Sequence, residues 1–356
     1  HDRAETASSA AAAPAADEDS AAEDSAAAEQ AEQAASTTAA PASTASPATT
    51  SPAPPDACSA GATAVTGDAT LASGGNDYDY HVFVPPGYTP VPTPLVLNFH
   101  GLGSDGAGQA GFSNYQGVAV EEGFVVVHPT GLIVESSGDR RSWELPQLPD
   151  DERDDVGFVR DLIAEVGRQV CVDAARVYAT GMSNGGFLSS VLACEMADTF
   201  AATFSVAAVT HPDGCTPSRP IAMGAVHGTA DEVVPYSGGG GSTLIDTADE
   251  SFDAETLADF FSQVMPEEMA EFAADFDCGP AVDTTVGPDT TLRTWSDCDG
   301  GVELVFYTVE GGGHTWPGSM LARAYAAQLG YATDDVDAAR DGWAFMSRFT
   351  LERDEP

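Results

Sequence analysis

The amino-acid sequence predicts an α/β protein whose central, mostly parallel sheet carries helices on both faces. Several predicted strands are continuous apolar runs, which is typical of strands that are buried on both faces. These strands alternate with helical segments along the chain, without internal repeats. In addition, one strand runs into a serine framed by glycines, Gly181-Met182-Ser183-Asn184-Gly185, and then into a helix.

The predicted domain covers residues 58–356, a length within the range of a single α/β domain. Its predicted strands are Tyr78–Val84, Pro94–His100, Phe124–His128, Arg176–Thr180, Ala202–Val209, Ile221–His227 and Val302–Val309. Its predicted helices are Tyr115–Glu122, Val156–Val170, Asn184–Ala197, Ala254–Phe276 and Val336–Phe349. Asp154 and Asp155 precede the second helix, where they could line a site, but carboxylates at a helix N-terminus are usually caps.

Residues 1–57 consist almost entirely of Ala, Ser, Thr, Pro, Glu and Asp, so they lack the apolar surface needed to fold. We expect a disordered acidic tail whose proline-rich end acts as a spacer and could tether the domain to a cell surface. The chain begins at His1 without an initiator Met or an apolar signal region, so we interpret it as a mature or trimmed form.

The chain is strongly acidic. Its 356 residues include 56 acidic and 13 basic residues, a formal net charge of −43 at pH 7, and every basic residue is an arginine. Such a surface repels phosphate backbones and anionic membranes, which excludes nucleic-acid binding, and it suits high ionic strength. Although 43% of the residues are hydrophobic, no run is long and apolar enough to span a bilayer.

The six cysteines form no C-x-x-C pair and have no histidine at metal-binding spacing, so we expect no metal site. Three disulfides are the natural interpretation, and six buried free thiols in a cytosolic enzyme are the alternative. Proximity along a wound sheet favours the pairs Cys58–Cys171, Cys194–Cys215 and Cys278–Cys298.

The glycine-framed serine has the features of a nucleophile elbow. A strand that turns sharply into a helix leaves no room for neighbouring side chains, and Gly181 and Gly185 have none. The turn would expose Ser183 Oγ and would point the amide of Asn184 at a developing oxyanion. An ordinary turn with a capping serine is the alternative, but the apolar segments on both sides favour the elbow.

Two further residues complete a candidate catalytic constellation. A serine nucleophile needs a histidine base, and that base needs an acid that fixes its tautomer. Asp231 lies just beyond one predicted strand, and His314 lies in a glycine-rich run beyond the last one. The order Ser183, Asp231, His314 is that of the α/β-hydrolase fold, in which each of the three follows a strand. Glu232 is a weaker candidate for the acid, and we expect His227 to support the acid loop.

An oxyanion hole needs a second backbone amide besides that of Asn184. The segment His100-Gly101-Leu102-Gly103-Ser104 directly follows a predicted strand, which matches the early loop that supplies this donor in α/β hydrolases. We therefore assign the second donor to the amide of Leu102. A tight glycine turn without such a role is the alternative.

Five segments together resemble the esterase/polyhydroxybutyrate (PHB) depolymerase family of α/β hydrolases, which includes feruloyl and acetylxylan esterases. The segments are Asn98–Gly101, Asp154–Phe158, Gly181–Gly186, His227–Asp231 with Val234–Tyr236, and Gly311–Gly318. The similarity spans roughly Asp77–Phe349. It implies a secreted serine carboxylic ester hydrolase without a metal or organic cofactor, whose catalytic residues are Ser183, Asp231 and His314.

The resemblance implies a polyester substrate of the polyhydroxyalkanoate type, with esters of the plant cell wall, feruloyl or acetylxylan, as the alternative. We expect a monomer. A peptidase is a weaker hypothesis, because the chain has no room for the propeller domain of prolyl peptidases. A catalytically dead surface or binding protein is another, and the presence of all three candidate catalytic residues argues against it.

The sequence departs from the family in two places. Ser142 precedes Trp143 where relatives often carry a Cys-Trp pair, and Ser251–Asp277 is longer and more acidic than a plain helix. Both places flank the predicted cleft. Trp143 and Trp316 lie near the predicted site, so exposed rings there would grip an apolar or aromatic acyl group, and packing under a loop is the alternative for each.

Overall fold

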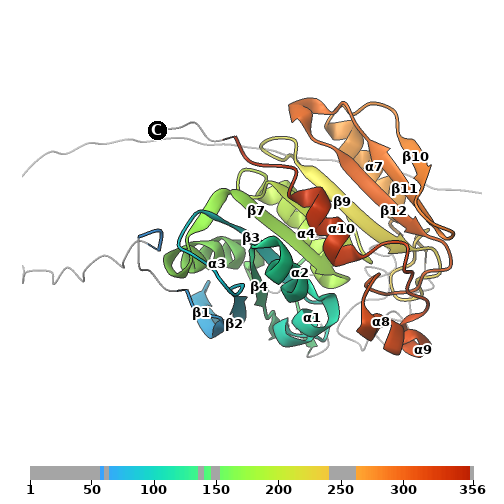
Figure 1. The fold of residues 1–356 in the computed structure, drawn as a ribbon. Coiled ribbons are helices and arrows are strands. Elements are labelled where there is room, and N and C mark those ends of the chain that lie inside the picture. Colours follow the sequence, from blue (N-terminus) through green and yellow to red (C-terminus); the bar gives the residue numbers. More distant parts are fainter. Residues whose placement is uncertain (1–56, 60–63, 135–139, 146–152, 240–261, 353–356) are drawn as a thin grey trace, which may run out of the picture. The chain divides into compact units, whose positions relative to one another are not determined.

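The computed structural model describes residues 57–59, 64–134, 140–145, 153–239 and 262–352, and these residues adopt an α/β-hydrolase fold (Figure 1). The tail predicted for residues 1–57 lies outside the described residues, apart from Ala57, and so remains a prediction. Among the described helices, none combines the length and the apolar composition needed to cross a bilayer.

The described strands form one large sheet and one small ribbon. The large sheet contains β1 (Gly67–Ser73), β2 (Asn76–Phe83), β3 (Thr93–Phe99), β4 (Val125–Pro129), β7 (Val172–Met182), β8 (Ala202–Val206), β9 (Ala222–Gly228), β10 (Val282–Thr285), β11 (Thr290–Trp295) and β12 (Leu304–Val309). Its spatial order is β1-β2-β4-β3-β7-β8-β9-β12-β11-β10. The run from β4 to β12 is parallel, and both edges are antiparallel. The ribbon pairs β5 (Leu132–Val134) with β6 (Arg140–Ser142).

Every predicted strand is present, with ends that differ by a few residues. The sequence did not reveal β1, β5, β6, β10 or β11. The edge strands β1 and β10 contain few large apolar residues: β1 alternates between half-buried and exposed positions, and β10 is exposed along its whole length. Because the prediction rested largely on apolar runs, it found the buried parallel strands together with β2 and missed the other antiparallel strands.

The described α-helices are α1 (Gly106–Ser113), α2 (Tyr115–Glu122), α3 (Asp155–Gln169), α4 (Asn184–Glu195), α7 (Met265–Asp275), α8 (Met320–Ala324), α9 (Ala326–Leu329) and α10 (Ala338–Met346). The helix predicted for 254–276 is too long, because residues 262–264 are not helical and α7 begins at Met265, with Pro266 in its first turn. Residues 254–261 lie outside the described residues. Helices α1, α8 and α9 were not predicted.

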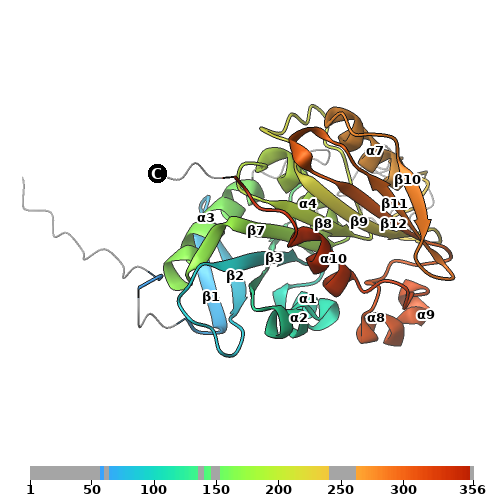
Figure 2. The same cartoon turned by 45° about the horizontal axis from the view of Figure 1, so that its top comes forward.

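The helices cover both faces of the sheet, with α2 and α10 on one face and α3 and α4 on the other (Figures 1 and 2). Aromatic side chains join the layers: Trp343 of α10 stacks on Phe124 with ring centroids 4.1 Å apart, and Tyr78 of β2 stacks on Phe158 of α3 at 3.8 Å. The carboxyl ends of the parallel strands share one edge of the sheet, so the loops that follow β3, β7, β9 and β12 meet there.

Three disulfides, Cys58–Cys171, Cys194–Cys215 and Cys278–Cys298, connect the cysteines in the pairs expected from the sequence. None of the six cysteines is free, so the alternative of buried thiols is wrong. The second disulfide joins the end of α4 to the loop after β8, and the third joins the end of α7 to the turn before β12. Disulfides of this kind persist in oxidising compartments.

Helix α7 carries a buried carboxyl group. Glu268 is only 9% exposed, and its Oε2 accepts a hydrogen bond from the backbone N–H of His211 at 2.7 Å. Burial raises the pKa of Glu268 from 4.5 to about 7, and the neighbouring carboxylates of Glu271 and Asp213 also raise it, whereas the His211 N–H lowers it. The native protein therefore holds this proton to a higher pH than the unfolded chain.

We predict that the contribution of Glu268 to the free energy of unfolding falls as the pH rises from about 4.5 to about 7, because in this window Glu268 keeps its proton in the folded state and loses it in the unfolded state. Between these pH values the unfolding equilibrium constant should rise less in Glu268→Gln than in the parent protein, by a factor of at least about ten. Urea denaturation at pH 4.5, 6 and 8 measures it. Glu267→Gln is the matched control, since Glu267 is exposed. Equal pH slopes in both variants would contradict the prediction.

Candidate active site

Ser183 occupies a strained turn between β7 and α4. Its backbone angles are φ 56° and ψ −122°, a conformation that costs about 1–3 kcal/mol for a residue other than glycine. Hydrogen bonds hold it there: its N–H donates to Val206 O at 2.8 Å, and its carbonyl oxygen accepts from the N–H groups of Gly186 and Phe187. The backbone around Ser183 therefore has the geometry predicted for an elbow.

The two framing glycines are required by close backbone contacts. A Cβ atom at Gly181 would lie 2.4 Å from Gly185 O, and a Cβ at Gly185 would lie 2.4 Å from Phe99 O. Strands β3 and β7 and the start of α4 therefore meet here through their backbones. Any side chain at either position would push the serine turn away from the end of β3.

His314 and Asp231 are hydrogen-bonded to each other at the same edge of the sheet. The distance from His314 Nδ1 to Asp231 Oδ2 is 2.8 Å, and both side chains are almost completely buried. Asp231 Oδ1 accepts hydrogen bonds from the N–H groups of Val233 and Val234 at 2.8 and 2.9 Å. These contacts fix the orientation of the carboxylate. Glu232, the weaker candidate for the acid, is exposed.

The surroundings keep Asp231 ionised. Burial alone would raise the pKa of this carboxyl group, but the charge and hydrogen bond of His314, together with those of His227, hold it well below its usual value. A carboxylate can only accept, so the shared hydrogen belongs to His314 Nδ1. In the neutral ring, Nε2 is therefore the basic nitrogen of His314.

His227 supports the acid loop, as the sequence suggested. Its Nε2 lies 2.8 Å from the carbonyl oxygen of Val234 and 3.3 Å from Asp231 Oδ2. Because both of these partners only accept, Nε2 carries the hydrogen. The ring thus connects the end of β9 to the loop that holds Asp231.

The loop after β3 passes directly against the serine. A Cβ atom at Gly101 would lie 3.3 Å from Ser183 Cβ, so the backbone of residues 101–104 runs beside the elbow. The N–H groups of Gly103 and Ser104 donate to Arg141 O and Gly101 O, which gives the loop a fixed shape. Leu102, the predicted second oxyanion donor, lies within this loop.

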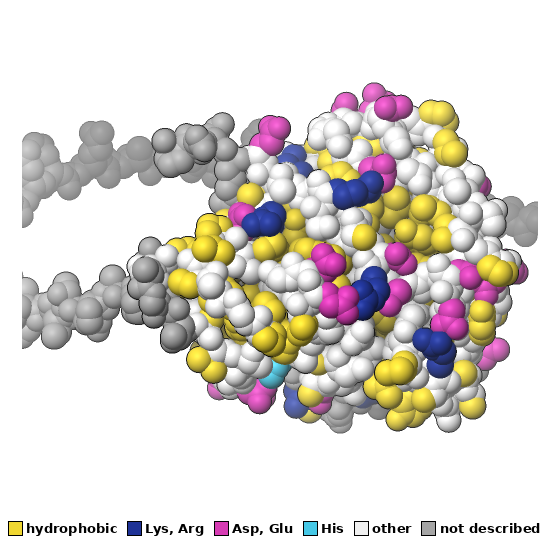
Figure 3. Space-filling view, in the orientation of Figure 1, with side chains coloured by type: hydrophobic (Ala, Val, Ile, Leu, Met, Phe, Trp, Pro, Cys, Tyr) yellow, Lys and Arg dark blue, Asp and Glu magenta, His cyan; other side chains and the backbone are white. Residues whose placement is uncertain are grey.

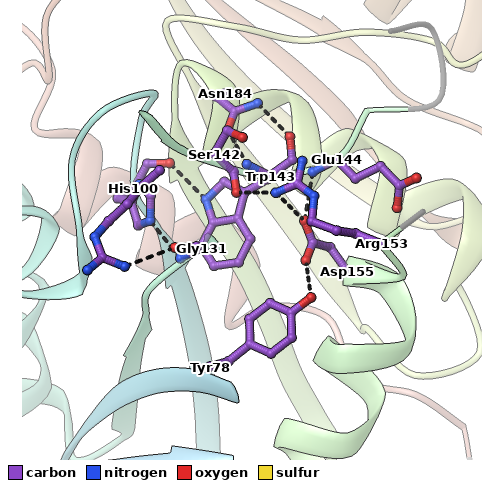
Figure 4. Close-up of polar contacts among 10 residues, drawn as sticks. Tyr78, His100, Gly131, Ser142, Trp143, Glu144, Arg153, Asp155 and Asn184 are labelled. Atoms are coloured by element: carbon purple, nitrogen blue, oxygen red, sulfur yellow. Dashed lines mark hydrogen bonds and ion pairs between the residues drawn. The ribbon is translucent and has the colours of Figure 1, made fainter. Parts of the chain in front are cut away.

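Trp143 connects this loop to the elbow (Figure 4). Its backbone N–H donates to Asn184 Oδ1 at 2.6 Å, and Asn184 Nδ2 donates back to Trp143 O at 3.1 Å. Its indole Nε1–H donates to the carbonyl oxygen of His100 at 2.9 Å. A single residue therefore binds the segments that contain both predicted oxyanion donors.

The expectation that Trp143 and Trp316 present exposed rings is wrong. Trp143 is 1% exposed and Trp316 is fully buried. The hydrogen bonds to His100 and Asn184 hold the ring of Trp143 inside, and Trp316 packs edge-on against Tyr115 with ring centroids 6.0 Å apart. Packing under a loop, the alternative for each residue, is what the structure shows.

His100 must be neutral to make its contacts. Its Nδ1–H donates to Gly101 O at 2.8 Å, while its Nε2 accepts the N–H of Gly131 at 2.9 Å. Only a ring with one protonated nitrogen can do both. Burial lowers the pKa of His100 to about 4, so this tautomer persists at neutral pH. The sequence pointed to His100 only as the start of the glycine loop.

Asp155 anchors the segment around Trp143 from below (Figure 4). Its Oδ1 accepts from Tyr78 OH at 2.8 Å, and its Oδ2 accepts from the N–H of Glu144 at 2.7 Å. Arg153 lies 3.6 Å from Asp155 and donates to Ser142 O. Asp154 is a helix cap, as the sequence favoured, but Asp155 is a buried structural acid, which its position in the sequence did not reveal.

No group of three or more His, Cys, Asp or Glu side chains is arranged to hold a metal ion in the part of the chain that the structure describes.

The fold, the strained turn at Ser183 and the hydrogen-bonded His314–Asp231 pair are typical of α/β hydrolases. The model of the family described as Esterase PHB depolymerase matches residues 78–230, and the chain belongs to this family. Feruloyl esterase B of Piromyces equi is 30% identical over 72% of this chain and 42% of its own length. Feruloyl esterase D of Neurospora crassa is 26% identical over 83% of this chain and 91% of its own length. The matching family and the relatives identify the chain as a carboxylic ester hydrolase.

A third relative is the bifunctional acetylxylan esterase/xylanase XynS20E of Neocallimastix patriciarum, which is 25% identical over 77% of this chain. The match covers 34% of that protein. The chain therefore spans less than half of the Piromyces and Neocallimastix relatives but most of the Neurospora one.

We predict that Trp143→Phe lowers kcat about tenfold or more on small and bulky esters alike and changes KM little. The variant leaves His100 O without its buried donor, which loosens the loop beside the elbow. Kinetics with p-nitrophenyl acetate and a long-chain p-nitrophenyl ester, with melting temperatures, measure it.

Trp316→Phe is the matched control, because the Trp316 indole nitrogen has no hydrogen-bond partner among the described residues and only ring volume is lost. A rise in KM confined to the bulky ester, with p-nitrophenyl acetate spared, would instead mean that the Trp143 ring contacts substrate.

Proposed function

We propose that the protein is a serine ester hydrolase that works through an acyl-enzyme. Ser183 Oγ attacks the ester carbonyl and its proton passes to His314 Nε2, which then protonates the departing alcohol. Water, deprotonated by the same nitrogen, releases the acid. The observations that carry this proposal are the 2.8 Å hydrogen bond to Asp231, which leaves His314 Nε2 as the basic nitrogen, and the positive φ of Ser183 in the turn between β7 and α4.

In this mechanism the amides of Leu102 and Asn184 stabilise the oxyanion. The contact between Gly101 and Ser183 supports the first assignment, and the position of Asn184 at the N-terminus of α4 supports the second. The helix dipole adds positive potential at the same point. Asp231 stays ionised and stabilises the imidazolium that forms during the reaction.

We infer that the substrate is a polyester of the polyhydroxyalkanoate type. The matching family description supports this substrate, as does the apolar surface beside the His314 loop, described in the next section. Esters of the plant cell wall are the second candidate, favoured by the feruloyl and acetylxylan esterases among the relatives. The three disulfides support export from the cell, with residues 1–57 as a tail or spacer.

We predict that Ser183→Ala and His314→Ala each lower kcat by at least about 10³-fold, and that Asp231→Asn lowers it by about 10⁴-fold because the wrong tautomer of His314 is favoured. The melting temperatures of the first two variants should stay near that of the parent protein. Labelling with a fluorophosphonate checks the nucleophile independently: the parent protein should react at Ser183 and the alanine variant should not. Near-normal turnover by Ser183→Ala would overturn the mechanism.

A substrate panel separates the two candidate substrates. We predict release of soluble acid from a PHB film at a rate well above that from methyl ferulate or acetylated xylan, with protein lacking Ser183 Oγ as the blank. Faster hydrolysis of the ferulate or the xylan ester would replace polyester by cell-wall ester as the assigned substrate and would leave the mechanism intact.

A further inference from the structure

An exposed apolar face follows the His314 loop. In α8, Met320 is 81% exposed and Leu321 is 42% exposed, and in the segment around α9, Tyr325 and Tyr331 are 53% and 48% exposed. We call these four side chains the apolar face. Figure 3 shows hydrophobic side chains gathered at the lower right, where Figure 1 places α8 and α9. Large apolar side chains grouped in this way mark interaction surfaces.

The apolar face is fixed to the candidate catalytic loop by backbone contacts. Gly313 N–H donates to Tyr331 O at 2.9 Å, immediately before His314, and Gly318 N–H donates to Thr333 O at 3.3 Å. Leu321 approaches Gly111 of α1, the helix that follows the loop of Leu102. The face therefore extends from the loop of the candidate base toward the helix that follows the predicted oxyanion loop.

The composition of this segment contrasts with the rest of the chain. None of the 56 acidic residues lies in 311–333, and the single basic residue there, Arg323, pairs with Asp334 at 2.6 Å. The segment is thus close to neutral in a chain of net charge −43. Anionic membranes and nucleic acids are repelled by such a protein, and so is a second copy of the same chain. A neutral apolar surface is not repelled by the charge of the protein.

We propose that the apolar face docks the protein on the surface of a solid, neutral, aliphatic polyester and so delivers ester bonds to Ser183. This inference rests on the proposed ester hydrolase function, but it concerns binding and not cleavage. Met320 and Leu321 bury aliphatic surface against the polymer, and the rings of Tyr325 and Tyr331 add further apolar surface. Because the contact is apolar, adsorption persists in salt that screens charge.

The test measures adsorption separately from hydrolysis. The variant Met320→Ser/Leu321→Ser/Tyr325→Ser is compared with the parent, both carrying Ser183→Ala, by depletion of protein from solution over a PHB film in 0.1 M and 1 M sodium sulfate. We expect at least about tenfold weaker adsorption of the variant at both salt concentrations. With Ser183 restored, the ratio of film hydrolysis to p-nitrophenyl acetate hydrolysis should fall by a similar factor.

The matched control is Val65→Ser/Val91→Ser/Val282→Ser, which removes three exposed apolar side chains elsewhere in the domain. It should adsorb like the parent. Tyr325→Phe keeps the ring and should also adsorb like the parent, which separates loss of contact from misfolding, and melting temperatures accompany each variant.

Two outcomes would overturn the proposal. Adsorption equal to the parent in the triple variant would show that another surface binds the polymer. A change in sedimentation from dimer to monomer, caused by the same variant, would show that the face joins two copies of the chain. If instead the serine mechanism were wrong, Ser183→Ala would keep its turnover. The difference in adsorption between the parent and the triple variant would not change.

Discussion

The close backbone crossing at Gly181 and Gly185 is the constraint on which the rest of the site depends. With carbonyl oxygens 2.4 Å from where each Cβ would be, β3, β7 and α4 can meet only if both positions lack side chains. That crossing places Ser183 at a positive φ and brings Gly101 against it. The cost of the strained residue is offset by its three backbone hydrogen bonds and by helix α4, which is buried from Asn184 to Cys194.

The second requirement is that the loop after β3 and the elbow keep a fixed separation, and a buried polar network around Trp143 provides it. Trp143 hydrogen-bonds to both segments, and Asp155 with Arg153 holds the chain on either side of Trp143. Hydrogen bonds have directions, whereas apolar contacts do not, so such a network specifies one geometry. The neutral ring of His100 continues the network to Gly131.

The sequence predicted the parts of the fold whose physical signal is local. Buried parallel strands show as apolar runs, and the elbow shows as glycines around Ser183, because each pattern arises from a few neighbouring residues. The edges of the sheet and the short helices α8 and α9 have no such pattern. The sequence placed Trp143 near the candidate site, but it predicted an exposed ring where the structure has a buried one. The burial depends on hydrogen bonds to Asn184 and His100, which are distant in sequence. Contacts between residues that are distant in sequence leave no local pattern, so such a pattern cannot predict them.

The pair of histidines around Asp231 shows how local contacts outweigh the charge of the whole chain. A net charge of −43 opposes ionisation of any carboxyl group, but that effect is spread over the molecule and screened by salt within about 10 Å. Two imidazoles lie within 3.3 Å of the Asp231 oxygens, and they lower its pKa by more than burial raises it. The rings of His227 and His314 differ in which nitrogen contacts Asp231. His227 uses Nε2 for both Val234 and Asp231, whereas His314 meets Asp231 through Nδ1 and keeps Nε2 for proton transfer in the proposed reaction. The glycine-rich loop around His314 permits this orientation, because at Gly313 a Cβ would lie 2.1 Å from Leu329 O.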